Sequence, residues 1–113
     1  MSDRLPAHLE AAGLIRRAQA AGGFAVVLHK GERDAGTILV VGLENGANPR
    51  LYERMPGLGS ERPWTVTRSQ DTENKKEFED YLQKRCSQDP DLWLIELDVA
   101  AVARLIGSEP AGD

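Results

Sequence analysis

The sequence predicts an α+β domain built on a mostly antiparallel sheet of about five strands, with the helices packed mainly on one face. Short apolar runs recur between turn signals, which is typical of strands. Most of these runs follow one another directly, which favours hairpin connections between them. Stretches with helical periodicity flank the run of strands. The expected order of elements is α-β-β-β-β-α-β-α.

The N-terminal part is expected to contain one helix followed by two strands. Apolar residues of segment 6–21 gather on one side of a helix and two glycines follow, so this segment predicts the first helix. Segments 24–29 and 37–44 are short and rich in β-branched residues, and both predict strands. The polar, glycine-bracketed segment 31–36 predicts a hairpin connection between them. Because both strands are apolar on both faces, we expect them to lie centrally in the sheet, covered on two sides.

Three further strands and two further helices are expected downstream. Segments 50–54, 64–67 and 92–98 predict the third, fourth and fifth strands, with the fourth at an edge of the sheet. Asp71 or Thr72 is expected to cap a second helix that runs to about residue 88. Residues 99–106 predict a short terminal helix. The aperiodic segment 56–63 is expected to be the most mobile loop, and the tail 108–113 is expected to fray.

Length and composition limit the class of protein. A chain of 113 residues is expected to form a single domain, residues 1–113. Its 41% of hydrophobic and 28% of charged residues are typical of a folded globular protein. The only cysteine, Cys86, excludes an internal disulfide and a cysteine-based zinc site. Neither a signal segment nor an apolar run of ~20 residues is found, so we expect a cytoplasmic chain with no membrane segment. The net charge of −4 argues against nucleic acid as a partner.

Two blocks of the sequence are similar to a known family. The first is Gly22-Gly23-Phe24-Ala25-Val26-Val27 continuing to Asp34-Ala35-Gly36, and the second is Asp89-Pro90-Asp91-Leu92-Trp93-Leu94-Ile95-Glu96. Together they resemble domain of unknown function family 1491, a family of small bacterial proteins, over about residues 14–98. The resemblance implies a cytoplasmic bacterial protein, and it brings no activity, cofactor or catalytic residue with it.

Metal and phosphate chemistry find little support in the sequence. Histidine occurs only at positions 8 and 29. A metal site built from His29, Glu32 and Asp34 is conceivable, but polar residues in a turn are usually solvated. Segment 31–36 has the spacing of a phosphate loop but lacks the lysine that must follow its second glycine. We therefore expect no metal site, no cofactor and no identifiable catalytic residue.

Four residues are candidates for binding a ligand or partner, namely Arg62, Trp64, Glu96 and Asp98. Glu96 and Asp98 are two apart on a strand and share a face, where paired carboxylates can serve acid–base chemistry or hold a cation. The alternative is that Asp98 caps the terminal helix and Glu96 pairs with a nearby cation. For Trp64, beside the predicted mobile loop, a ligand or partner contact and core packing both stay open.

The sequence favours a non-enzymatic interaction or regulatory module that forms a homodimer. If both long helices pack on one side of the sheet, the other face is left to the terminal helix or to a second copy. A protein partner of unknown identity stays open. The alternative is a small-molecule-binding protein or enzyme, with its site near loop 56–64 and the end of the fifth strand. A third hypothesis, weak nucleic-acid binding, rests on the cations Arg16, Arg17, Lys30 and Arg33.

Overall fold

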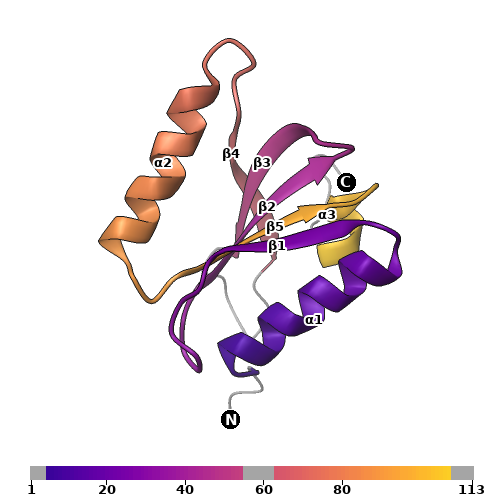
Figure 1. Cartoon of the computed structure of the whole chain (residues 1–113), viewed down its shortest axis with the longest axis vertical. Coiled ribbons are helices and arrows are strands. Elements are labelled where there is room, and N and C mark those ends of the chain that lie inside the picture. The colour runs from indigo at the N-terminus through magenta and orange to yellow at the C-terminus, as the bar shows by residue number, and fades with distance from the viewer. Residues whose placement is uncertain (1–4, 55–62, 108–113) are drawn as a thin grey trace.

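A computed structural model describes residues 5–54 and 63–107 of the chain (Figure 1). The elements follow the predicted order, and they are α1 (Ala7–Ala20), β1 (Phe24–His29), β2 (Ile38–Glu44), β3 (Ala47–Arg54), β4 (Trp64–Ser69), α2 (Lys75–Gln88), β5 (Trp93–Asp98) and α3 (Val102–Ile106). The predicted frayed tail, 108–113, and all but the last residue of the predicted mobile loop, 56–63, lie outside the described residues.

The five strands form one mixed sheet in the order β1-β5-β2-β3-β4. β5 is antiparallel to β1 and parallel to β2, and β3 is antiparallel to both β2 and β4. All neighbouring pairs except β2 with β5 are therefore antiparallel. The predicted α+β class with a mostly antiparallel sheet is confirmed.

β1 and β2 do not form the predicted hairpin, because β5 lies between them. Ile95 of β5 is opposite Val27 of β1 on one side and in register with Val40 of β2 on the other. β2 is buried on both faces, as predicted for a central strand. The prediction that β1 is also central was wrong, since β1 forms an edge of the sheet and Phe24 is 73% exposed. An apolar sequence shows that a strand needs apolar neighbours, but it does not show which strand takes the place beside it.

The connection from β1 to β2, residues 30–37, passes directly against the start of β5, and we call it the crossing loop. The Glu32 N–H donates to the Asp91 carbonyl at 2.8 Å, and the indole N–H of Trp93 donates to the Glu32 carbonyl at 2.7 Å. Gly31 and Gly36 lie so close to Asp91 that a Cβ atom at either position would overlap its carbonyl oxygen. Glycine is required at both positions because the two backbones approach closely. These contacts hold β5 between β1 and β2.

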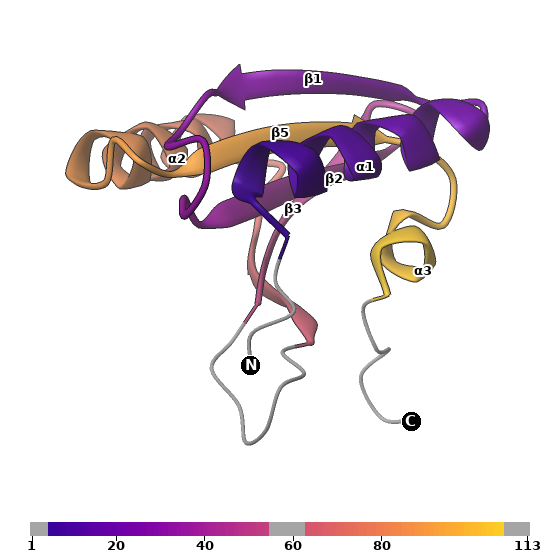
Figure 2. The same ribbon diagram turned by 90° about the horizontal axis from the view of Figure 1, so that it is seen from below.

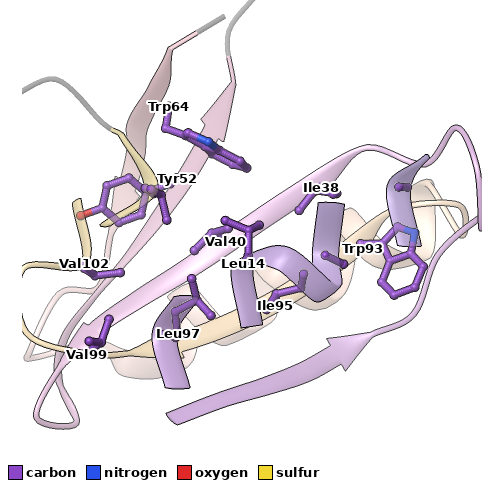
Figure 3. Close-up of a cluster of buried hydrophobic side chains, with 14 residues drawn as sticks. Leu14, Ile38, Val40, Tyr52, Trp64, Trp93, Ile95, Leu97, Val99 and Val102 are labelled. Atoms are coloured by element: carbon purple, nitrogen blue, oxygen red, sulfur yellow. The ribbon is translucent and has the colours of Figure 1, made fainter. Parts of the chain in front are cut away.

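The two faces of the sheet carry separate hydrophobic cores. α1 and α3 cover one face, where Leu14 of α1 packs among residues that include Val40 and Ile95 (Figure 3). α2 covers the opposite face through Phe78 and Leu82. Two of the three helices thus share a face, in agreement with the predicted, mainly one-sided packing. The pair that shares it is α1 and α3, however, and the expectation that the two long helices pack together on one side was wrong.

α1 lies close to the sheet because its buried side is made largely of small residues. The buried alanines are Ala7, Ala11 and Ala18, each at most 2% exposed. The Ala7 N–H donates to the Asp34 carbonyl of the crossing loop at 2.9 Å. Farther along the helix, the Glu10 carboxylate accepts two hydrogen bonds from the Arg54 guanidinium of β3. The helix is therefore fixed both to the crossing loop and to the sheet.

The cap of α2 differs from the predicted one. The side-chain oxygen of Asn74 accepts a hydrogen bond from the Glu77 N–H at 3.3 Å, so Asn74, and neither Asp71 nor Thr72, caps this helix. Asp71 shapes the turn that precedes the cap, where its carboxylate accepts from the Glu73 N–H at 2.9 Å. All of these positions carry residues that favour caps, and the backbone turn decides which one is used.

α3 begins three residues later than predicted and has no side-chain cap. Its N-cap residue is Ala101, in the left-handed conformation with φ 56° and ψ 44°. The expectation that Asp98 caps this helix was therefore wrong. Alanine is strained in this region because its Cβ approaches the following carbonyl group. The chain accepts this strain to turn from β5 into α3, whose Val102 and Ile106 are buried against the sheet.

We expect Gly36→Ala to lower the free energy of unfolding by about 1–3 kcal/mol, because the added methyl group overlaps the Asp91 carbonyl and pushes the crossing loop away from β5. Gly13→Ala is the matched control, since Gly13 lies inside α1 with open space at its Cα and alanine should stabilise the helix by about 1 kcal/mol. Urea unfolding followed by circular dichroism measures both variants. Unchanged stability of Gly36→Ala would contradict the tight crossing.

We expect Ala101→Gly to stabilise the protein by about 0.5–1 kcal/mol. Glycine removes the cost of the left-handed conformation, roughly 1–2 kcal/mol, and part of this gain is offset by the greater freedom of glycine in the unfolded chain. The measurement is the midpoint of urea unfolding at unchanged slope. A variant less stable than the native protein would show that the alanine methyl group makes a contact that outweighs the strain.

Candidate functional site

β1 forms an apolar edge of the sheet, with no described element beyond it (Figure 2). Its sequence, Phe-Ala-Val-Val-Leu-His, holds no Asp, Glu, Lys, Arg or Pro. Its exposed large side chains are Phe24 at 73%, Val26 at 48%, Val27 at 40% and Leu28 at 47%. Edge strands usually carry charges or prolines that prevent pairing with another chain. The β1 edge, residues Phe24–His29, has neither protection.

The opposite edge of the sheet, β4, is polar by comparison. Its sequence is Trp-Thr-Val-Thr-Arg-Ser, and Val66 is its one exposed large hydrophobic side chain, at 39%. The Thr67 hydroxyl donates to the Glu53 carboxylate at 2.6 Å. The Arg68 guanidinium lies over the Tyr81 ring, 3.7 Å from its centre. The β4 edge thus carries the polar groups expected of an edge that faces water, and the β1 edge does not.

A groove of about 700 Å³ lies beside the β1 edge, where the end of β1 meets α2. Its lining includes Leu28, His29, Leu82, Cys86, Pro90 and Leu94. β1 bulges at this point, since the register of the β1–β5 pair shifts between Val27 and His29. The bulge brings Leu28 and His29 to the rim of the groove, so the edge and the groove form one continuous surface, partly apolar, on the α2 side of the sheet.

Two side chains of the groove, His29 and Cys86, are of types that can act as catalysts, but their environments in the structure do not favour that role. The His29 imidazole is bonded through Nδ1 to the Leu92 carbonyl at 2.6 Å, which fixes the ring at the end of β1. Burial raises the pKa of the Cys86 thiol, and the positive charge of Arg85 only partly opposes this effect. A thiol with a raised pKa is a poor nucleophile at neutral pH, since the thiolate is the reactive form. The groove is therefore better suited to binding than to nucleophilic catalysis.

The structure does not bring the four predicted site residues together. Glu96 and Asp98 share a face of the sheet, as predicted, and this face is the α2 side. Neither forms an ion pair among residues 5–54 and 63–107. Trp64 is 7% exposed and packs in the core on the α1 side, with the Arg54 guanidinium 4.7 Å from its ring centre. Two strands, β2 and β3, separate its strand β4 from β5 in the sheet. Arg62 lies outside the described residues.

The polar turn considered for metal binding is part of the crossing loop. The Glu32 carboxylate accepts hydrogen bonds from the N–H groups of Asp34, at 2.8 Å, and Ala35, at 2.5 Å. These two bonds, that from Ala35 first, lower the pKa of Glu32. Residues 5–54 and 63–107 contain no group of three or more His, Cys, Asp and Glu side chains placed to hold a metal ion. No helix within the same ranges is long and apolar enough to cross a membrane.

An ion pair fixes α2, and with it one wall of the groove, to the sheet. The Arg85 guanidinium donates two hydrogen bonds to the Glu53 carboxylate of β3, at 3.0 and 3.1 Å, and a third to the Tyr81 hydroxyl at 3.0 Å. Burial raises the pKa of Glu53, but the bonds from Arg85 and Thr67 and nearby positive charge lower it by more, so the net pKa lies below its ordinary value. Glu53 is charged at neutral pH and is held by a bidentate partner.

The sequence matches a family model described as "Protein of unknown function (DUF1491)" over residues 5–107. The chain belongs to the DUF1491 family. The family resemblance predicted from the sequence is thereby confirmed. No curated protein matches the sequence.

Solved structures similar to this chain, two of them of DUF1491 family proteins, have the same fold. A crystal structure of a DUF1491 family protein from Caulobacter crescentus CB15 has a TM-score of 0.78 at 26% identity, covering 93% of this chain and 97% of that one. A solution structure of a protein from A. tumefaciens has a TM-score of 0.76 at 29% identity, covering 95% and 98%. An NMR structure of a Caulobacter crescentus DUF1491 family protein has a TM-score of 0.74 at 28% identity, covering 92% and 94%.

The two sequence blocks that resemble DUF1491 proteins meet in space at the crossing loop. Gly36 ends the first block and packs against Asp91 of the second. Trp93, also of the second block, donates its backbone N–H to the Thr37 carbonyl at 2.8 Å. These contacts give the residues of the two blocks a structural role, because they hold the crossing loop against the start of β5. The exposed apolar surface formed by the β1 edge and its groove was not predicted from the sequence. The absence of charged residues and proline from segment 24–29 was a signal for it.

We expect Glu53→Gln to destabilise the protein by about 1–2 kcal/mol at pH 7, because it removes a charge-assisted bidentate interaction. The folded-state pKa of Glu53 is lowered, so its stabilising contribution is present above the ordinary pKa of 4.5 and is lost as the pH falls below it. The difference in unfolding free energy between native protein and variant should therefore shrink from pH 6 to pH 3 (about these limits).

Arg85→Met tests the same pair from the other side. It leaves the Glu53 carboxylate charged and without its ion-pair partner, with the Thr67 hydroxyl still donating to it, and should be more destabilising than Glu53→Gln at pH 7. Urea unfolding at several pH values measures both variants. A constant difference between native protein and Glu53→Gln across the acid range would contradict this account of the pair.

Proposed function

We propose that this DUF1491 protein is a non-enzymatic interaction module of the bacterial cytoplasm that acts as a homodimer, formed by pairing the β1 edges of two copies. The observation that carries the proposal is the composition of the two edges. β4 is polar and suited to water, whereas β1 exposes Phe24, Val26, Val27 and Leu28 with no charge among them. Such an edge is a template for another strand.

A second copy of the same chain satisfies the β1 edge by symmetry. Two antiparallel edge strands related by a two-fold axis present the same surface to each other, and two-fold dimers are the commonest assemblies of soluble proteins. The result is a continuous sheet of ten strands, twice the five of one copy. The dimer expected from the sequence had a different basis, since it assumed that β1 was central and lacked cover on one face. The exposed edge supports self-association independently of that assumption.

We expect native protein at micromolar concentration to elute in size-exclusion chromatography with light scattering at twice 12.4 kDa. Val26→Lys should convert it to a 12.4 kDa monomer, because the charge would be buried in the middle of the paired strands. Val66→Lys, on the β4 edge, is the matched control: Val66 is of the same residue type, is 39% exposed against 48% for Val26, and should leave the dimer intact. A native protein that elutes as a clean monomer refutes the proposal.

A second candidate function, small-molecule binding, is favoured by the groove. Its volume of about 700 Å³ falls within the range of ligand sites. Among the described residues, this hollow lies beside β1 and α2, whereas the sequence placed the site near loop 56–64 and the end of the fifth strand. A small apolar ligand that binds the Val26→Lys monomer but not the native dimer would place ligand and second copy at the same surface. A native monomer that binds such a ligand would favour this second function.

A further inference from the structure

We propose that Phe24 of each copy occupies the groove of the other copy. This inference rests on the proposed β1 dimer, and it names the contact that sets the register of that dimer. Phe24 has the highest exposure of the large hydrophobic residues in the described ranges, at 73%. It stands at the start of β1, whereas the groove lies at the end of the same strand.

Phe24 and the groove lie on the same face of the sheet. In the β1–β5 pair, Phe24 is opposite Asp98 and His29 is opposite Leu94. Residues that are opposite each other in antiparallel strands point to the same face. Asp98 and Leu94 are four apart on β5, so they also share a face. Leu94 belongs to the core cluster under α2. Phe24 and His29 therefore both point to the α2 side, where the groove opens.

A two-fold axis through Val26 and normal to the sheet brings Phe24 to the groove. This axis pairs Val26 with Val26 of the second copy and Ala25 with Val27, so that opposite residues share a face and both α2 helices lie on the same side. Phe24 then comes level with the bulge at residues 28–29, which borders the groove of the second copy.

In the two neighbouring registers, Phe24 does not reach the groove of the second copy. An axis through Ala25 places Phe24 beside Val26 of the second copy and leaves the bulge unpaired. An axis through Val27 carries Phe24 beyond His29, where β1 ends. Of these registers, only that with its axis through Val26 pairs residues 24–28 of both strands and brings both Phe24 rings to the groove.

The surface suits a second copy in charge and in area. Neither strand of the pair carries a charged residue, so self-pairing brings no like charges together, and an acidic or basic peptide finds no partner on β1. A Phe side chain of roughly 200 Å² that is 73% exposed offers about 150 Å² from each copy. With the other exposed side chains and the strand backbones, the dimer buries on the order of 1,000 Å², the lower limit for a specific interface.

The single native cysteine allows a direct test, because Cys86 lines the groove. Phe24→Cys places a second thiol on the residue that we assign to the groove of the other copy. Treatment with a short bis-maleimide should link residue 24 of one copy to Cys86 of the other, giving a covalent dimer on a denaturing gel and a 24–86 cross-linked peptide by mass spectrometry. Val66→Cys should give no such dimer, and Phe24→Cys with Cys86→Ser should lose it.

Phe24→Ala provides a second measurement that needs no cross-link. It should raise the dimer dissociation constant roughly 10- to 100-fold in analytical ultracentrifugation, and it should speed the reaction of Cys86 with a thiol reagent, because the groove is no longer filled. Circular dichroism confirms that the variant is folded.

The outcomes separate the two proposals. If the native protein is a monomer, the proposed function fails and this inference fails with it. If the native protein is a dimer that Val26→Lys disrupts, but Phe24→Ala changes neither its affinity nor Cys86 labelling and Phe24→Cys gives no link to Cys86, the dimer stands and the assignment of Phe24 to the groove is overturned.

Discussion

The close approach of the crossing loop to the start of β5 is the constraint on which the rest of the fold depends. Hydrogen bonds join Glu32 to Asp91 and Trp93, and glycine at two positions lets the backbones approach this closely. With β5 fixed there, β2 becomes a central strand and β1 can only be an edge. The start of α1 is bonded to the same loop, so the position of that helix follows as well.

Two consecutive residues of β3 connect the sheet to both long helices. Glu53 and Arg54 point to opposite faces, because side chains alternate along a strand. Glu53 binds Arg85 of α2, and Arg54 binds Glu10 of α1. Each pair is partly buried and bidentate, which gives it a defined geometry. The ion pair between Glu53 and Arg85 thus holds α2, which forms the outer wall of the groove, although Glu53 lies on β3 and not near the β1 edge.

The sequence was sufficient to predict the elements and their order, because strands and helices depend on local patterns. The neighbour of β1 could not be predicted in this way. Residues 24–29 are apolar on both faces, which indicated a central strand, and it is the contacts of Asp91 and Trp93 with the crossing loop that place β5 beside them. The groove was beyond prediction for the same reason, since its lining comes from β1, α2 and β5. The sequence left the role of Trp64 open between a ligand or partner contact and core packing. In the structure, its ring lies in the core beside Arg54.

The late position of β5 in the chain has a consequence for synthesis. Within residues 5–54 and 63–107, β5 is the one strand that pairs with β1, so β1 cannot join the sheet until Trp93–Asp98 have left the ribosome. β1 is among the first elements made, and its apolar side chains must wait in water while most of the chain is translated. Such long-range pairing slows folding and exposes aggregation-prone segments to other nascent chains. For this protein, protection by a chaperone matters most before β5 emerges.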